Sequence, residues 1–289
     1  MRDVDVPEFE YPDYSDRQLV AIPLAVLALA LVVLLVWALF VPPVGTPVNP
    51  GIDFTGGTEM HVETTASQEE IEAAFTAEVE SIQPIAAQEN VYVVTFQSTD
   101  TEQIRGDAET AGFEIRSEST VSASFGAGAQ TEALLGVAIA FLGMSVLVFL
   151  MFRTFVPSIA VVASAFSDIV VPLALMNLFG IDLSLATVAA LLMIIGYSVD
   201  SDLVLNNHIL RRRGDFYESA HRAMQTGVTM TTTSLAAMSV MTIVAYLLNV
   251  PLLPEIGIVL VFGLLADLMN TYLMNMSLLR WYKYEGVAR

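Results

Sequence analysis

Long stretches without a charged residue constrain this 289-residue chain more than any other feature. Three of them lie between Arg17 and Asp53, between Glu132 and Arg153, and between Arg222 and Glu255. Each stretch can hold the roughly 20 apolar residues that a helix needs to cross a hydrocarbon layer about 30 Å thick. Hydrophobic residues make up 55% of the chain and charged residues 15%, which is unusual for a soluble globular protein. The sequence therefore predicts a protein that crosses a membrane several times.

Six membrane-spanning helices are predicted from the apolar segments. They lie near Leu19–Val41, Ala133–Phe152, Val156–Phe179, Leu183–Ile209, Gly227–Leu248 and Ile256–Leu279. The first segment is not expected to be a cleaved signal peptide, because its apolar run is too long, the tail before it is acidic, and Pro42 and Pro43 follow it.

The positions of the basic residues predict the orientation. If six helices alternate, the basic residues fall on one side, which is then cytoplasmic: Arg153, the arginines at 211–213 and 222, Arg280, Lys283 and Arg289. Both termini would be inside. The expected division is an acidic cytoplasmic tail at 1–17, a first span at 18–41, an external domain at 42–130, spans two to six at 131–280, and a cytoplasmic tail at 281–289.

The net charge of -19 indicates an organism that lives in high salt, where dense carboxylates keep a protein hydrated. An acidic surface for a basic partner is the alternative, but the acids are spread over the tail and the whole external segment instead of forming one block. The absence of cysteine excludes disulfides, thiolate metal sites and cysteine nucleophiles.

The external segment alternates between strand and helix patterns. "TEMHVET" predicts a strand, and "SQEEIEAAFTAEV" predicts a helix that opens with Ser67 and Glu70 as a capping box. Two strands follow about a turn at Glu89 and Asn90, then a helix behind Thr99 that ends at Gly112. "FEIRSESTVSASF" predicts a closing strand, and "GAGA" at 126–129 a hinge to the second span.

The expected fold class is therefore an all-α six-helix membrane bundle with an α+β external domain between the first and second transmembrane helices. The order βαββαβ is that of the ferredoxin-like split unit.

The segment "NPGIDFTGGT" precedes the first strand of this domain. A glycine-rich loop with an acid could suggest phosphate binding, but no Lys-Ser/Thr pair follows and the loop leads into a strand. A structural role is favoured, in which Gly56 and Gly57 allow a tight turn and a close approach of the backbone where the domain meets the membrane.

The fourth span, "LLMIIGYSVDSDLVLNNHILRRR", carries two aspartates among apolar residues. An unpaired carboxylate near the middle of a bilayer costs about 2.5 to 3.5 kcal/mol on insertion scales, so an unused one is not expected there. The spacing predicts two opposite stripes on this helix. One contains Gly196, Asp200 and Asn207, and the other contains Ser198, Asp202 and Asn206. A functional role is favoured for Asp200 over a merely structural hydrogen bond.

Other polar residues are also embedded. Asp168 in the third span and Asp267 in the sixth add two carboxylates, each of which fits a function and a structural hydrogen bond equally well. The hydroxyl run from Thr229 to Ser234 favours structural hydrogen bonds between helices, and His208 favours an interfacial position. Embedded aspartates also occur in intramembrane proteases, but the Gly-x-Gly-Asp element is missing, as are zinc and serine hydrolase motifs. No enzymatic activity is expected.

Three segments of the sequence resemble the SecF branch of the SecD/SecF protein-export family, within the resistance-nodulation-division superfamily. They are "GIDFTGGT", "FRTFVPSIAVVASAFSDIVV" and "IDLSLATVAALLMIIGYSVDSDLVLNNHILRRR". "GIDF-x-GG" together with "GYSV-D" favours SecF over its sister SecD. The signature positions are Gly51, Asp53, Gly56, Gly57, Gly196 and Tyr197.

The resemblance implies an accessory subunit of the Sec protein translocase in an archaeal, halophilic cell membrane. The implied partners are SecD, a SecY-type channel, the translocating polypeptide and membrane lipids, with no nucleic acid. No catalytic residue, cofactor or metal site is expected. The candidates for an ion relay are Asp200, Asp202 and Asp168.

The chain departs from the family pattern at two places. Asp200 falls on the family's fourth-span acid, but Ser201 occupies the next position, where bacterial members often carry Asp. Bacterial relatives also have an embedded arginine in the fifth span, whereas no arginine occurs here between Arg222 and Arg280. The coupling ion, proton or sodium, stays open. We expect Asp200→Asn to slow export and Asp202→Asn to act more mildly. The alternative function is a small-molecule or lipid exporter of the same superfamily, which would normally carry two six-span units.

Overall fold

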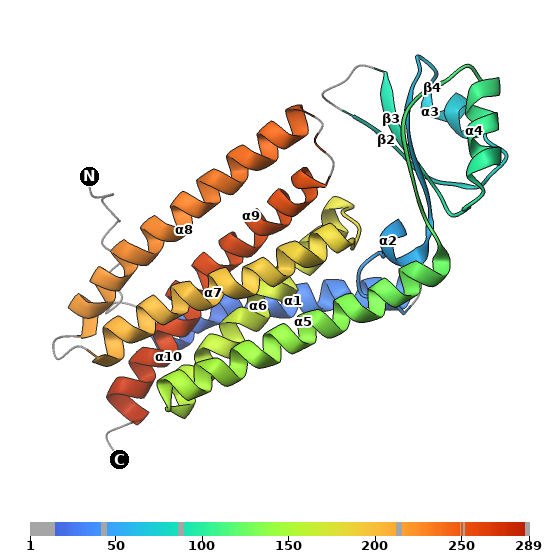
Figure 1. The fold of residues 1–289 in the computed structure, drawn as a ribbon. Coiled ribbons are helices and arrows are strands. Elements are labelled where there is room, and N and C mark those ends of the chain that lie inside the picture. The colour runs from blue at the N-terminus through green and yellow to red at the C-terminus, as the bar shows by residue number, and fades with distance from the viewer. Residues whose placement is uncertain are drawn as a thin grey trace.

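The computed structural model describes residues 15–41, 45–85, 90–211, 216–248, 250 and 252–286. Within these residues, six helical segments are long and apolar enough to cross a membrane, which confirms the predicted number. The helices are α1 (Asp16–Phe40), α5 (Ala123–Phe152), α6 (Phe155–Phe179), α7 (Leu185–Arg211), α8 (Phe216–Leu247) and α9 (Leu253–Met269). The last segment continues through the π-helix η2 (Asn270–Asn275), α10 (Met276–Trp281) and the π-helix η3 (Tyr282–Gly286). They lie side by side as one elongated bundle (Figure 1).

The bundle has an inner and an outer set of helices. In their most apolar windows, α6, α7 and the α9 segment bury half or more of their residues, whereas α1, α5 and α8 bury less than a quarter. The outer helices expose large aliphatic side chains such as Leu29, Leu147 and Leu247. Such surfaces suit a hydrocarbon solvent, so polar side chains on the inner helices are the unusual feature of this bundle.

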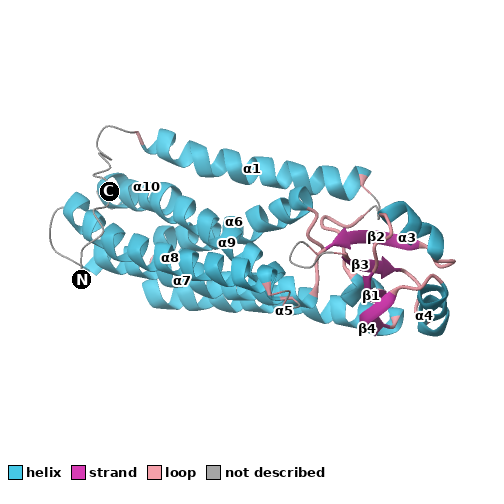
Figure 2. Ribbon diagram, turned by 90° about the horizontal axis from the view of Figure 1, so that it is seen from above, coloured by secondary structure: helices cyan, strands magenta, loops and turns pink. Residues whose placement is uncertain are grey.

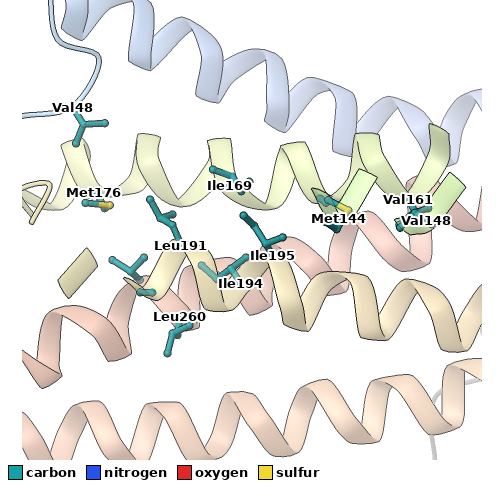
Figure 3. Close-up of a cluster of buried hydrophobic side chains, with 13 residues drawn as sticks. Val48, Met144, Val148, Val161, Ile169, Met176, Leu191, Ile194, Ile195 and Leu260 are labelled. Carbon is teal, nitrogen blue, oxygen red and sulfur yellow. The ribbon is translucent and has the colours of Figure 1, made fainter. Parts of the chain in front are cut away.

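The apolar core of the bundle joins α5, α6, α7 and α9. Its buried members are Val48, Met144, Val148, Val161, Ala165, Ile169, Met176, Ala190, Leu191, Ile194, Ile195, Val259 and Leu260. Figure 3 shows these side chains meeting between the helices. Val48, which lies before the sheet in sequence, packs into the same cluster. The chain that leads out of α1 is therefore anchored in the core of the bundle.

Between α1 and α5 the chain forms a four-stranded sheet. Its strands are β1 (Gly57–Glu63), β2 (Val79–Pro84), β3 (Val91–Phe96) and β4 (Glu114–Val121). They pair in the order β2-β3-β1-β4, and all three pairings are antiparallel. We call residues 57–121 the sheet domain.

Two helices, α3 (Gln68–Ala74) and α4 (Thr101–Thr110), cover one face of this sheet. A separate core forms beneath them from Met60, Val62, Ile71, Phe75, Val94, Phe96, Ile104 and Ala108. Figures 1 and 2 place both helices on the side of the sheet that faces away from the bundle. The uncovered face of the sheet therefore faces the ends of the membrane helices.

The local signals at the two helix starts had different outcomes. The capping box is confirmed, because Ser67 N donates to Glu70 Oε2 at 2.8 Å and Glu70 N donates to Ser67 Oγ at 3.3 Å. The helix predicted to start behind Thr99 begins at Thr101, and its cap is Asp100, whose Oδ1 accepts from Gln103 N at 3.2 Å. Glu89, in the predicted turn before β3, lies outside the described residues.

The expected hinge at 126–129 is also wrong. Helix α5 begins at Ala123, and Ser122 Oγ caps it by accepting from Phe125 N at 3.3 Å. The "GAGA" segment thus lies inside the first turns of a continuous helix, where Gly126 packs against the backbone of Phe54. The small residues serve close packing at this position instead of flexibility.

Candidate functional site

Three carboxylic acids are buried where α6, α7 and α9 meet. Asp168 and Asp202 are 0% exposed and Asp267 is 2% exposed. They come from three different helices, and serine, threonine and asparagine side chains surround them. A buried acid normally requires hydrogen-bond partners, so the contacts of each carboxylate define the site.

Asp168 is held from two helices. Ser198 Oγ of α7 donates to its Oδ2 at 2.6 Å, and Asn270 Nδ2 of η2 donates to its Oδ1 at 2.6 Å. Each of its oxygens therefore has a partner.

Asp202 is bound on one oxygen only. Thr271 Oγ1 and Asn275 Nδ2 both donate to Asp202 Oδ1, each at 2.8 Å. Its Oδ2 is buried and has no hydrogen-bond partner among the described residues. Asn206 binds the main chain of the same turn, with Nδ2 donating to the Asp202 carbonyl at 2.8 Å, and its own Oδ1 is also without a partner there.

Thr271 connects Asp202 to Asp267, and Ser201 connects Asp267 to the backbone of Ser198, whose hydroxyl binds Asp168. Ser201 Oγ lies 2.7 Å from Asp267 Oδ1 and 2.9 Å from the Ser198 carbonyl. Thr271 Oγ1 lies 3.2 Å from the same oxygen of Asp267, in addition to its contact with Asp202. A hydroxyl has one proton to donate, so each can satisfy only one of its acceptors at a time. The cluster can therefore rearrange its hydrogen bonds by rotating hydroxyl groups, without moving a helix.

The π-helix η2 supplies three of the donors, namely Asn270, Thr271 and Asn275. Asn270 binds Asp168 of α6 and Asn275 binds Asp202 of α7, so this π-helix contacts acids on two helices. Sequence reasoning missed these residues. The signal that could have found them is "DLMNTYLMN", which places polar residues at 267, 270, 271 and 275 in an apolar span.

The two predicted stripes on α7 are separated as expected. Ser198, Asp202 and Asn206 are buried in the cluster, whereas Gly196 and Asp200 are exposed on the other side. The side chains of Asn207 and His208 lie outside the described residues. The structure thus brings Asp168 and Asp202 together with Asp267, and it places Asp200 elsewhere.

Asp200 lines an open apolar groove between α5 and α7, of about 540 Å³. The other residues of this groove are Met144, Leu147, Val148, Leu150, Met151, Ile195, Gly196, Val199 and Leu203. Gly196 has open space where a side chain would begin, because a Cβ there would meet no atom within 4 Å. The next residue, Tyr197, is 37% exposed. A single carboxylate therefore faces outward from an otherwise apolar part of the bundle.

The remaining signature residues lie at the base of the sheet domain. Gly51 N donates to the Leu183 carbonyl at 2.8 Å, and Asp53 Oδ2 accepts from Leu185 N at 2.9 Å. Gly56 has φ +79°, and a Cβ there would lie 2.6 Å from the backbone of Ala123. The predicted close approach of the backbone is thus observed at Gly56. Among the described residues, no group of three or more His, Cys, Asp or Glu side chains is arranged to hold a metal ion.

The fold and this cluster define a class of membrane protein, with six spans, buried acids on its central helices and a small sheet domain after the first span. Two family models match it: "Protein export membrane protein SecD/SecF, C-terminal" over residues 101–285, and "SecD/SecF GG Motif" over residues 44–68.

Curated relatives match over the whole length. The protein-export membrane protein SecF of Haloferax volcanii is 64% identical, and that of Haloquadratum walsbyi 61%, each over 100% of both chains. The SecF of Methanocaldococcus jannaschii is 36% identical over 93% of this chain and 96% of its own. The chain belongs to the SecF family. The two haloarchaeal relatives agree with the high-salt interpretation of the net charge.

A solved structure shares the fold. The crystal structure of SecDF, a translocon-associated membrane protein from Thermus thermophilus, matches with a TM-score of 0.74 at 18% identity. The match covers 96% of this chain and 39% of that chain, so this chain corresponds to less than half of SecDF.

Proposed function

We propose that this chain is an accessory subunit of the Sec protein translocase, which acts with SecD to promote export of polypeptides across the cell membrane and uses an ion gradient to do so. The names of its full-length relatives support the export role. The observation that supports the coupling is the buried cluster of Asp168, Asp202 and Asp267, in which the Thr271 hydroxyl joins Asp202 to Asp267 and can switch between them. Embedded acids of this kind serve ion pathways in many membrane proteins.

The buried acids of this chain are stabilised differently from those of bacterial relatives, which carry an embedded arginine in the fifth span. No lysine or arginine occurs between Arg222 and Arg280, so the middle of the fifth span offers the buried acids no permanent positive charge. Hydroxyl and amide donors take that place, supplied mainly by Ser198, Ser201 and η2. Such donors stabilise a carboxylate without fixing a counter-ion, which leaves its charge free to change with the bound ion.

Asp200 has a separate role in this proposal. A carboxylate that faced only hydrocarbon would cost about 2.5 to 3.5 kcal/mol, and a protein partner with hydrogen-bond donors would remove much of that cost. We assign the groove between α5 and α7 to a membrane helix of SecD, with Asp200 as its polar anchor.

Copurification tests this assignment. We expect Asp200→Leu, expressed at the normal level, to recover several-fold less SecD from mild detergent, because the anchor is lost. Asp200→Asn keeps a hydrogen-bonding side chain of the same size and should retain SecD. Full recovery of SecD with Asp200→Leu would contradict the assignment of the groove.

The sheet domain corresponds to the external ferredoxin-like domain of the proposal. The strand order β2-β3-β1-β4, with one helix after β1 and one after β3, supports this assignment to the split βαββαβ unit. Its uncovered face lines a cleft of about 280 Å³ with the ends of α8 and α9, and the lining includes Glu59, His61 and Gln83. We place the emerging polypeptide against this polar face.

The orientation also belongs to the proposal. The end of α5, the start of α8 and the end of α10 lie far from the sheet domain in Figure 1. Arg153 directly follows α5, Arg222 lies in the second turn of α8, and Lys283 follows α10. Basic residues favour the cytoplasmic side, so the sheet domain should be outside and residues 1–17 and 281–289 inside. Residues 1–14, Arg212 and Arg213 lie outside the described residues.

Cysteine labelling tests the orientation, because the natural chain has no cysteine. We expect a membrane-impermeant maleimide added to intact cells to label Glu109→Cys, on the exposed side of α4, and not Tyr284→Cys, near the other end of the molecule. Tyr284→Cys should react only after the cells are lysed. The reverse pattern would overturn the orientation.

A further inference from the structure

We propose that Asp53 is a positioning residue, which fastens the sheet domain to the first turn of α7 so that the domain and the buried acid cluster move as one body. We call residues 47–57 the clasp. Its consequence for export rests on the proposed function, whereas the restraint itself rests on the contacts of the clasp.

Asp53 caps a helix that is far from it in sequence. Its Oδ2 accepts from the backbone N of Leu185, the first residue of α7, at 2.9 Å. The first amides of a helix lack intrahelical acceptors, and the positive end of the helix dipole favours a carboxylate there. Ser184 and Thr187 complete the cap, since Thr187 N donates to Ser184 Oγ at 3.2 Å and Ser184 N donates to Thr187 Oγ1 at 2.8 Å. Asp53 thus adds to this local cap a contact from the clasp, which leads directly into the sheet domain.

Backbone pairing fixes the clasp to the same loop. Gly51 N donates to the Leu183 carbonyl at 2.8 Å, and Leu183 N donates to the Asn49 carbonyl at 2.7 Å, which forms a short parallel bridge. Asn177 Nδ2, near the end of α6, donates to the Pro47 carbonyl at 2.8 Å. The clasp is therefore tied to α6, to the α6–α7 connection and to α7 itself.

The other side of the clasp is wedged against α5. Asp53 lies within the short helix α2 (Ile52–Thr55). A Cβ at Gly126 would lie 2.7 Å from the Phe54 carbonyl oxygen, and a Cβ at Gly56 would lie 2.6 Å from Ala123. These distances leave no room for α2 to slide between α5 and α7 without breaking its contacts. Because β1 begins at Gly57, the restraint passes directly into the centre of the sheet.

Helix α7 links the clasp to the acids. Ser198 lies 13 residues after Leu185, which corresponds to about 20 Å along the helix axis. The helix is continuous from Leu185 to Arg211, so a shift of the helix at Asp202 also shifts its first turn at Leu185. The geometry makes the sheet domain a fixed extension of the helix that carries the acids, instead of a domain that swings on a free linker.

Hydrogen exchange on the full-length protein in detergent tests the positioning role. We expect Asp53→Ala to speed exchange of the first-turn amides of α7 about tenfold, with exchange in β1 and β3 unchanged. Asp53→Asn keeps an acceptor oxygen and should restore most of the protection. Asp182→Ala is the matched control, because its carboxylate makes no hydrogen bond in the described part of the chain and should leave α7 unchanged. Equal exchange in Asp53→Ala and the natural protein would overturn the role of Asp53.

Export measured in cells tests the consequence. Asp53→Ala should reduce the part of the export rate that depends on membrane potential several-fold, and Asp53→Asn should recover it. Faster exchange in α7 without any loss of export would overturn the coupling through the clasp. This outcome differs from failure of the proposed function itself, which would leave export insensitive to substitutions in the acid cluster as well.

Discussion

Replacing Gly57 by Val is expected to unfold the sheet domain. Gly57 has φ +138°, which a β-branched residue rarely adopts, and its missing Cβ leaves room for the Phe96 carbonyl oxygen of the neighbouring strand. The residue also pairs with Val121 of β4, so it cannot shift without disturbing both sides of β1. Backbone strain alone costs about 1 to 3 kcal/mol, and the overlap with the carbonyl adds to it. The sum is a large share of the roughly 5 to 15 kcal/mol that stabilises a typical domain.

Thermal unfolding and limited proteolysis of the full-length protein measure this effect. Gly106→Ala is the matched control, because Gly106 lies inside α4 with open space around it. That change should increase stability by up to about 1 kcal/mol, since alanine favours helix. Thr55→Ser should be neutral, because its hydroxyl keeps its contacts with the Gly51 and Gly56 carbonyls. A Gly57→Val protein with natural protease resistance would show that the close approach is not required.

Replacing Asp202 by Ala is expected to destabilise the bundle by about 2 to 5 kcal/mol. The change removes the acceptor for Thr271 Oγ1 and Asn275 Nδ2 and leaves a small cavity among fully buried side chains. Hydrogen bonds between membrane helices contribute about 0.6 to 2 kcal/mol each, which sets the lower part of this range.

Asp202→Asn is expected to keep the fold. The new amide retains an acceptor at the Oδ1 position. Its NH2 group takes the place of Oδ2, which has no partner now, in a cluster where Asn206 Oδ1 and Asn275 Oδ1 also lack partners within the described residues. Thermal unfolding of the two variants in detergent measures their stabilities. If the Asp202→Ala protein were as stable as the Asp202→Asn protein, the contacts of Asp202 with η2 would contribute little to the stability of the bundle.

Much of the architecture follows from the sequence, because the bilayer imposes simple requirements. Apolar runs of sufficient length predicted the six spans, and side-chain alternation predicted the four strands. The period of an α-helix separated Asp200 from Asp202 correctly onto opposite faces. Periodicity does not say which of two polar faces turns inward, because that depends on the neighbouring helices.

Other features depend on packing that no local pattern encodes. The π-helix η2 departs from the regular helical period, so Asn270, Thr271 and Asn275 could not be assigned to one face in advance. The glycines at 126 and 128 are typical of a flexible connection, yet Gly126 packs against Phe54 inside a helix. The bond between Asp53 and Leu185 joins residues 132 positions apart and leaves no sequence signal of its own.

Burial changes the expected ranking of the two aspartates of α7. Asp202 lies inside the network that joins three helices, whereas Asp200 lies in the outer groove. We therefore expect Asp202→Asn to have the larger effect on coupling, and Asp200→Asn a smaller one, in contrast to the order that the sequence alone favours. A membrane potential of 100 mV makes about 2.3 kcal/mol available per charge moved, which is enough to drive a change in such a network.

The most direct test of the account is the export rate of secreted proteins in cells that carry Asp202→Asn in place of the natural chain, measured with and without a membrane potential. The protein should be present in the membrane at its natural level and recover SecD normally. We expect the increase in export caused by the potential to fall about tenfold or more, a change of about 1.4 kcal/mol or greater in the coupled step. Export by Asp202→Asn cells at the natural rate under a membrane potential would contradict it and leave the buried acids as structural contacts only.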